Sequence, residues 1–143
     1  MEQVIVDLIS EIDPAFYVIE CLPNMLSPEL IIERTAPLVQ TIRAKQAQIP
    51  IILVDNFVYE PSILNLQMNT DIQKLNAALY GEYKKLIALG IDQLYYINSA
   101  EATGNDHEGT VDGVHFTDLG FMRYSDFLIN QFEELGLLES NKQ

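Results

Sequence analysis

The sequence predicts an α/β domain with a parallel sheet, and three observations carry this prediction. Short, nearly unbroken apolar runs alternate along the chain with longer segments in which apolar residues recur at helical spacing. Prolines and glycines stand at the boundaries between these segments. The chain has 143 residues, 48% of them hydrophobic, which is enough for one domain with a sizeable core. We therefore expect residues 1–143 to form a single domain built from βαβ units.

The first helix and the first strand are predicted within residues 2–22. Apolar residues in 2–12 recur at helical spacing, and Asp13 and Pro14 end this helix. Its predicted core-facing residues are Val4 or Ile5, Leu8 and Ile12. Residues 16–22 (FYVIECL) form a short apolar run of the kind typical of a strand buried on both faces.

The second helix is predicted to begin at Pro28, with Ser27 as its N-cap. Pro37 lacks an amide hydrogen, so we expect it to restart or kink this helix, which continues to about residue 47. The core-facing residues here are expected to be Leu38 and Ile42. Residues 50–55 (PIILVD) are solidly apolar up to the terminal aspartate and predict the second buried strand.

The C-terminal half predicts a long helix, a third strand and a final helix. The long helix is expected over about residues 71–89 and ends at Gly90, which is typical of a glycine C-cap. Its apolar stripe comprises Ile72, Leu75, Leu79 and Leu86. Residues 94–98 (LYYIN) predict the third strand, and after a polar loop Thr117 caps a helix that Gly136 closes. The apolar residues at helical spacing in this last helix are Phe121, Leu128, Phe132 and Leu135.

The composition excludes several classes of partner. Eight basic and twenty-one acidic residues give a net charge of −13, which repels phosphate backbones and anionic lipid, so we expect neither a nucleic-acid nor a membrane partner. No apolar run approaches the roughly 18–20 residues that span a bilayer. The single cysteine, Cys21, excludes an internal disulfide. The chain also has no Cys/His zinc pattern, and no cofactor is implied.

The polar residues that follow the predicted strands are the candidate functional residues, because ligands of open parallel sheets bind at the carboxyl ends of the strands. Asn24 follows the first strand, Asp55 and Asn56 follow the second, and the loop after the third leads to Asp112 and His115. We interpret Asp55 and Asn56 as turn residues, because Asx side chains often cap turns after strands. The other three are the candidate site.

Asp112 and His115 have the spacing of an orienting carboxylate and a general base. They stand three residues apart, immediately before the helix that Thr117 caps. A carboxylate beside an imidazole fixes its tautomer and stabilises the imidazolium, as a base in acyl transfer requires. Spacing alone leaves a solvated loop histidine as the alternative. A second alternative is a metal-dependent hydrolase, in which the ligands would be Asp106, His107, Glu108, Asp112 and His115.

The string D-G-V-H-F-T-D-L-G at residues 112–120 closely resembles the last sequence block of the SGNH (GDSL-like) hydrolases. That block reads D-x-x-H-P-T and runs into a helix, and here Phe116 stands where the family prefers proline. The resemblance implies that His115 is the general base and that Asp112 orients it. It also implies a three-layer α/β/α fold of flavodoxin-like type.

Residues 18–25 (VIECLPNM) look like an upstream block of the same family, in which a strand runs into an asparagine. In the family this asparagine donates a hydrogen bond to the oxyanion, and the resemblance carries that role to Asn24. The usual form of the block is G-x-N-D, so Leu22 and Met25 depart from it.

The resemblance implies a serine esterase that hydrolyses short-chain or acetyl esters, of a small molecule or a carbohydrate, through an acyl-enzyme. The family's nucleophilic serine lies in a G-D-S motif after an earlier strand. None of the six serines lies in such a motif. We therefore expect the chain to be the C-terminal part of such a domain, truncated at the N-terminus and inactive by itself. The rival hypothesis is a non-catalytic α/β module that works by protein association.

The expected truncation has a consequence for association. In the flavodoxin-like strand order, the absent first strand would pair beside residues 16–21. Its absence would leave an apolar edge strand open, which favours pairing with another chain. We therefore expect a homo-oligomer formed through this sheet edge.

Overall fold

The computed structural model describes residues 1–139. Its contacts divide the chain into two compact units: the first comprises Met1–Asn56 and Thr70–Asn98, and the second comprises Phe57–Asn69 and the chain from Ser99 onward. The helices and strands are α1 (Gln3–Ile9), β1 (Tyr17–Glu20), α2 (Pro28–Lys45), β2 (Ile51–Val54), α3 (Leu66–Ala88), β3 (Leu94–Ile97) and α4 (Asp118–Glu134). Two short 3₁₀ helices, η1 (Leu22–Asn24) and η2 (Glu60–Ile63), follow β1 and precede α3.

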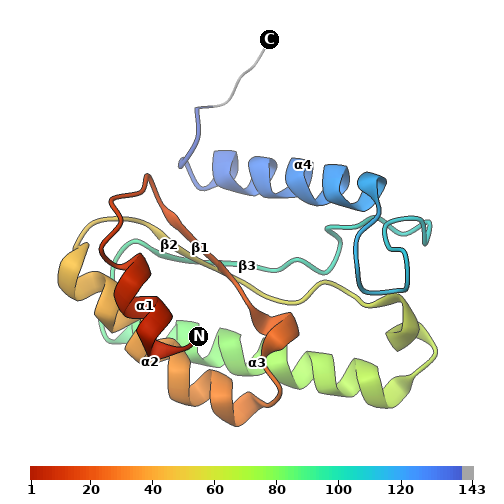
Figure 1. Ribbon diagram of the computed structural model, residues 1–143, viewed down its shortest axis with the longest axis horizontal. Coiled ribbons are helices and arrows are strands. Elements are labelled where there is room, and N and C mark those ends of the chain that lie inside the picture. The colour runs from red at the N-terminus through yellow and green to blue at the C-terminus, as the bar shows by residue number, and fades with distance from the viewer. Residues whose placement is uncertain (140–143) are drawn as a thin grey trace. The chain divides into compact units, whose positions relative to one another are not determined.

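The first unit holds a parallel three-stranded sheet in the order β1-β2-β3 (Figure 1). Tyr17 pairs with Ile51, and Ile51 pairs with Leu94, so these side chains share one face of the sheet. The helices α1, α2 and α3 lie on one side of the strands (Figure 1). The core cluster combines residues of these helices with that face, which confirms the predicted α/β fold with parallel strands. Its members are Val6, Tyr17, Leu22, Met25, Ile31, Leu38, Val39, Ile42, Ile51, Leu53, Leu79, Leu86 and Leu94.

The predicted helix signals are confirmed at three helix ends. The Ser27 hydroxyl accepts a hydrogen bond from the amide of Leu30 at 3.4 Å and caps α2. At the end of α3, Gly90 has a φ of +81°, and the Ile91 amide donates to the Leu86 carbonyl at 3.1 Å. Gly90 therefore acts as the predicted C-cap. The cap of α4 belongs to the candidate site and is described there.

Three details of the first unit differ from the predictions. The buried residue of α1 is Val6, whereas Val4, Ile5, Leu8 and Ile12 are exposed. The helix is only seven residues long, because the Tyr17 hydroxyl lies within hydrogen-bond distance of the Ile9 and Ile12 carbonyls, at 3.1 and 2.9 Å. This contact turns the chain away from helical geometry before Ile12.

The strand β1 is not buried on both faces as predicted. Val18 is 38% exposed and Glu20 is exposed, because β1 lies at the edge of the sheet, whereas every residue of β2 is buried.

The prediction of a restart at Pro37 is also wrong, since α2 continues through it. Because Pro37 has no amide hydrogen, the Glu33 carbonyl lacks its helical hydrogen bond. Both residues are exposed, so water can bind that carbonyl.

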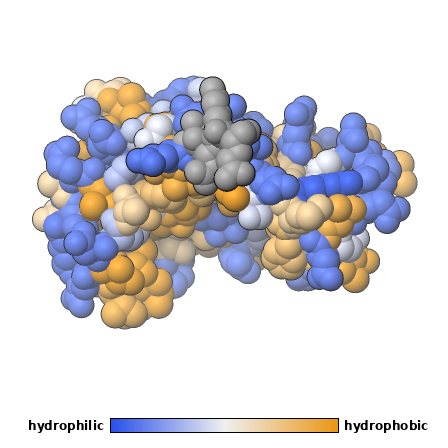
Figure 2. Space-filling model, turned by 90° about the horizontal axis from the view of Figure 1, so that it is seen from above, coloured by the Kyte–Doolittle hydropathy of each residue, from blue (hydrophilic) through white to orange (hydrophobic). Residues whose placement is uncertain are grey.

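The surface carries many exposed apolar side chains, and the two most exposed, Leu64 and Leu26, lie between helices and strands. On the face in Figure 2, hydrophobic residues gather in several separate groups with hydrophilic residues between them. No helix within residues 1–139 is long and apolar enough to cross a bilayer.

Candidate active site

The structure brings Asp112 and His115 together in one tight turn of the second unit. The His115 Nδ1 lies 2.7 Å from Oδ2 of Asp112. The other carboxylate oxygen, Oδ1, accepts hydrogen bonds from the amides of Val114 and His115 at 3.0 and 2.9 Å. These contacts, the His115 amide first, lower the pKa of the Asp112 carboxyl to about 2. The carboxylate is therefore ionised at neutral pH and faces one nitrogen of the imidazole.

The chain on either side of this turn is fixed by hydrogen bonds. The Val111 amide donates to the His115 carbonyl at 2.7 Å. The Thr117 hydroxyl donates to the Glu108 carbonyl at 2.9 Å and accepts from the Gly120 amide at 3.0 Å. Thr117 is therefore both the predicted cap of α4 and an anchor of the loop.

Gly120 allows the loop to lie directly on the first turn of α4. A Cβ atom at this position would stand 1.8 Å from the carbonyl oxygen of Gly109. Only glycine can accept so close an approach by the backbone. Gly120 is the last residue of the string D-G-V-H-F-T-D-L-G described above.

Phe116, which occupies the position where proline is preferred, lies among three other rings. Its ring centroid is 4.9 Å from that of Phe57, 5.0 Å from that of Tyr124 and 5.3 Å from that of Phe121. Phe121, one of the apolar residues at helical spacing in the predicted final helix, is 63% exposed and contacts Phe116 edge to face. The aromatic cluster supports the chain next to His115, which proline would otherwise stiffen.

Asn24 lies in the first unit, at the end of η1 and just beyond β1. Its backbone amide donates a hydrogen bond to the Cys21 carbonyl at 3.1 Å, and the residue is exposed. The structure thus pairs Asp112 with His115 in one unit and describes Asn24 in the other. Asn24 does follow a parallel strand, as the sequence predicted.

Asp55 and Asn56, interpreted from the sequence as turn residues, are both 2% exposed and bind groups of the first unit. Oδ2 of Asp55 accepts a hydrogen bond from the Tyr96 hydroxyl at 2.7 Å. Burial, with this hydrogen bond, raises the pKa of the Tyr96 hydroxyl. The backbone amide of Asn56 donates to Oδ1 of Asn76 on α3, and Nδ2 of Asn76 donates to the Asn56 carbonyl, both at 3.0 Å. These contacts give both residues a structural role.

Two of the other proposed metal ligands, Asp106 and His107, bind different groups. Asp106 forms two hydrogen bonds of 2.6 Å with Arg123, which lower the pKa of its carboxyl. His107 binds Glu60. Within residues 1–139 no three histidine, cysteine, aspartate or glutamate side chains are grouped so that they could hold a metal ion.

The serines of the described chain have local structural roles where their bonds are known. Ser27 caps α2, while the buried Ser10 and Ser62 donate to the Asp7 and Tyr59 carbonyls at 2.7 and 2.6 Å. Ser125 is exposed on α4, and Ser140 lies outside the described residues.

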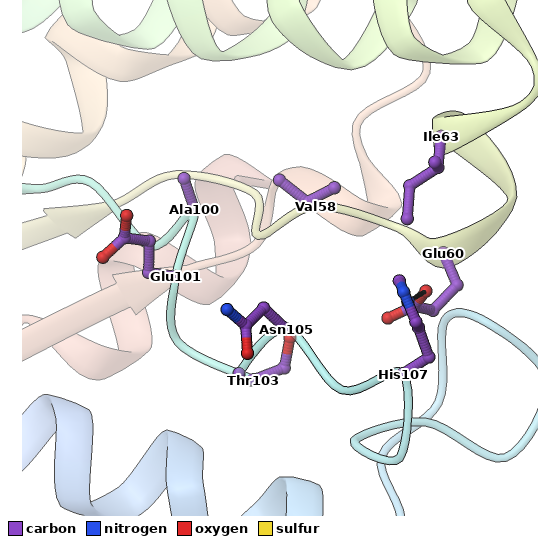
Figure 3. A pocket seen from close by; sticks show the side chains of 9 residues that line it. Val58, Glu60, Ile63, Ala100, Glu101, Thr103, Asn105 and His107 are labelled. Carbon is purple, nitrogen blue, oxygen red and sulfur yellow. Dashed lines mark hydrogen bonds and ion pairs between the residues drawn. The ribbon is translucent and has the colours of Figure 1, made fainter.

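Sequence reasoning missed a second histidine–carboxylate pair in the same unit. The His107 Nδ1 lies 2.6 Å from Oε2 of Glu60, although the two residues are 47 positions apart in the chain. Both line a cavity of about 460 Å³ (Figure 3). The only signal in the sequence was His107 itself, because nothing in the pattern connects it with Glu60.

Comparisons with known proteins assign the chain to a family. The model of the GDSL-like lipase/acylhydrolase family matches residues 1–133, and the chain belongs to this family. No curated protein matches the chain.

Two solved structures share the fold. A Bacteroides ovatus ATCC 8483 protein assigned to the GDSL-like lipases has a TM-score of 0.91 and 30% identity, over 97% of this chain and 41% of that protein. The salicylyl-acyltransferase SsfX3, from a tetracycline biosynthetic pathway, has a TM-score of 0.79 and 14% identity, over 96% of this chain and 42% of that protein. The chain thus spans about two fifths of the length of both structures.

Proposed function

We propose that this chain carries the general base of a serine esterase that hydrolyses short-chain or acetyl O-acyl esters. The observation that carries the proposal is the Asp112–His115 pair, held at 2.7 Å in a turn that fixes the carboxylate with two amides. A carboxylate in this position holds Nδ1 protonated and leaves Nε2 free to accept a proton. Family membership supplies the reaction class.

In the proposed mechanism, the nucleophilic serine comes from a part of the domain outside these 143 residues. Nε2 of His115 removes the serine proton as the oxygen attacks the ester carbonyl, and Asp112 stabilises the imidazolium that forms. Asn24 would donate a hydrogen bond to the developing oxyanion. His115 then gives its proton to the departing alcohol, and water releases the acyl group by the same steps in reverse order.

In this proposal the chain forms the C-terminal portion of one α/β domain and has no esterase activity by itself. The test uses p-nitrophenyl acetate with two proteins, the 143-residue chain and the chain extended by any coding sequence upstream in the same frame. The extended protein should turn the ester over, and His115→Ala should lower kcat by about 10³-fold or more. Asp126→Asn, an exposed carboxylate on α4, is the control and should leave the rate unchanged.

Two results would contradict this function. If His115→Ala left the rate of the extended protein unchanged, His115 would not be the general base. Turnover by the 143-residue chain that His115→Ala abolishes would show that the chain holds its own nucleophile.

A second candidate function is association of the chain with itself through the open edge of β1. Val18 and Glu20 are exposed on this strand, and a cleft of about 250 Å³ beside it is lined by apolar residues of α1, including Ile5 and Ile9. An exposed apolar edge strand favours pairing with another chain. Sedimentation velocity at tens of micromolar should find a dimer that Val18→Lys dissociates. A monomer of the unmodified chain under these conditions would overturn this candidate.

A further inference from the structure

The cavity that contains the second histidine–carboxylate pair lies wholly within the second unit. Two segments line it, one running from Val58 to Ile63 and the other from Ala100 to His107. Figure 3 shows side chains of both segments directed toward the space between them. Its volume of about 460 Å³ is in the range of small-molecule sites.

The lining combines a polar side with an apolar one. The apolar side chains are those of Val58, Ile63 and Ala100. The polar ones are those of Glu60, Glu101, Thr103, Asn105 and His107. The ionisable groups among them are two carboxylates and one imidazole, in a chain of net charge −13.

The polar side of the cavity is held in place before any ligand binds. His107 has a φ of +66°, a left-handed conformation that residues other than glycine rarely adopt. In this conformation Nδ1 of its ring lies 2.6 Å from Oε2 of Glu60, and this hydrogen bond holds the two side chains together. On the other side of the loop, Arg123 holds the carboxylate of Asp106 and, at 3.1 Å, the carbonyl of Thr103.

The cavity wall is joined directly to the turn that holds Asp112 and His115. The Glu60 amide donates to the Gly113 carbonyl at 3.0 Å. Pro61 packs so closely that a Cβ on Gly113 would stand 2.5 Å from its Cδ. The side chain of Glu60 thus faces the cavity while its backbone holds the turn of the candidate base.

We infer that this cavity binds the neutral, hydroxyl-rich part of the ester substrate, with Glu60, His107 and Asn105 as its hydrogen-bonding residues. That the bound group belongs to an ester rests on the proposed esterase function, whereas the binding of a hydroxyl-rich group in the cavity does not. Carboxylate and amide oxygens accept hydrogen bonds from hydroxyl groups. Two carboxylates against one imidazole disfavour an anionic ligand, and five polar side chains disfavour an alkyl chain. Val58 and Ile63 offer an apolar wall for the C–H face of a polyol ring.

The test measures binding to the ¹⁵N-labelled chain by NMR with three probes at equal concentrations. Methyl α-D-glucopyranoside is the hydroxylated probe, glucuronate is a similar ring that carries a carboxylate, and 1-hexanol is the alkyl probe. We expect the glucopyranoside to cause saturable shifts at the amides of Val58, Thr103, Asn105 and His107. Glucuronate should bind at least fivefold more weakly, and hexanol should leave these amides unshifted.

Three variants assign the contacts. Glu60→Ala and Asn105→Ala should each weaken glucopyranoside binding at least fivefold. The second variant leaves the Glu60–His107 hydrogen bond in place and so answers the question if the first disturbs the loop. Glu33→Ala, which removes an exposed carboxylate of α2 in the other unit, should bind the probe as well as the unmodified chain.

Several results would overturn the inference. They are an absence of saturable shifts at the cavity amides, tighter binding of glucuronate, and binding of hexanol in place of the polyol. Polyol binding in a protein whose esterase rate does not depend on His115 would leave the cavity assignment standing and refute only the proposed function. The two proposals therefore fail separately.

Discussion

The second unit contains two histidine–carboxylate pairs of nearly equal length that are built in different ways. His115 and Asp112 are three residues apart, and both belong to one hydrogen-bonded turn, with 2.7 Å between Nδ1 and Oδ2. His107 and Glu60 come from segments 47 positions apart, with 2.6 Å between Nδ1 and Oε2. The first pair is made by local chain geometry, and the second requires the folded unit.

The difference lies in what surrounds each pair. The Asp112 carboxylate receives two backbone amides besides the imidazole, so it stays in place as a fixed negative charge. Glu60 is held through its backbone at Gly113, while its side chain forms part of a cavity wall. A fixed carboxylate suits the orientation of a base, and a carboxylate on a cavity wall suits contact with a ligand. These surroundings support the proposals of a catalytic role for the first pair and a binding role for the second.

The largest expected effect comes from neutralising each carboxylate in the extended, active protein. Asp112→Asn should lower kcat by about 10²–10⁴-fold, because the neutral side-chain amide cannot stabilise the imidazolium or fix the tautomer as the carboxylate does. Glu60→Gln should act mainly on KM for a hydroxylated ester. Steady-state kinetics with an acetylated glucoside would measure both effects. Equal losses of kcat in the two variants would erase the distinction between the pairs.

Gly113 lies where the two pairs meet, and its replacement should disturb both. Its φ is +93°, and a Cβ would stand 2.5 Å from Pro61. Gly113→Ala should lower the free energy of unfolding by about 1–3 kcal/mol through strain and overpacking. Urea denaturation measures this change.

Gly81→Ala is the matched control, because Gly81 lies within α3 and a Cβ there would meet nothing within 4 Å. That substitution should stabilise the protein by about 0.5–1 kcal/mol, since alanine favours the helix. If the two alanine variants had the same stability, the close join between Glu60, Pro61 and the Asp112 turn would be refuted.

An acid titration should show that the Asp112 carboxylate stays ionised at a lower pH than an ordinary aspartate does. The folded pKa of Asp112, about 2, lies below its usual value of 3.8, so folding favours the charged carboxylate. Its contribution to stability is therefore complete above about pH 4 and is lost as the pH falls toward 2. The amide proton of His115, followed by NMR, should report a midpoint well below pH 3.8. A midpoint at or above that value would contradict the hydrogen bonds of the turn.

The sequence predicted those features that depend on neighbouring residues. The strands, the caps at Ser27 and Thr117 and the C-cap at Gly90 follow from local chemistry, as does the spacing of Asp112 and His115. Features that depend on contacts between separate elements of the folded chain were missed. The exposed side of β1 results from its edge position, and the end of α1 from the hydroxyl of Tyr17. The Glu60–His107 pair is of the same kind, because only the folded unit brings its members together.

The most direct test of the central claim is the tautomer of His115, read from the ring ¹⁵N shifts of the chain at neutral pH. With only two histidines in the chain, the two ring systems can be assigned by comparison with His107→Gln. If Asp112 orients His115 as a base, the neutral ring carries its proton on Nδ1 and leaves Nε2 bare, and Asp112→Asn reverses this preference. A ring protonated on Nε2 in the unmodified chain, unchanged by Asp112→Asn, would contradict the assignment of His115 as the general base.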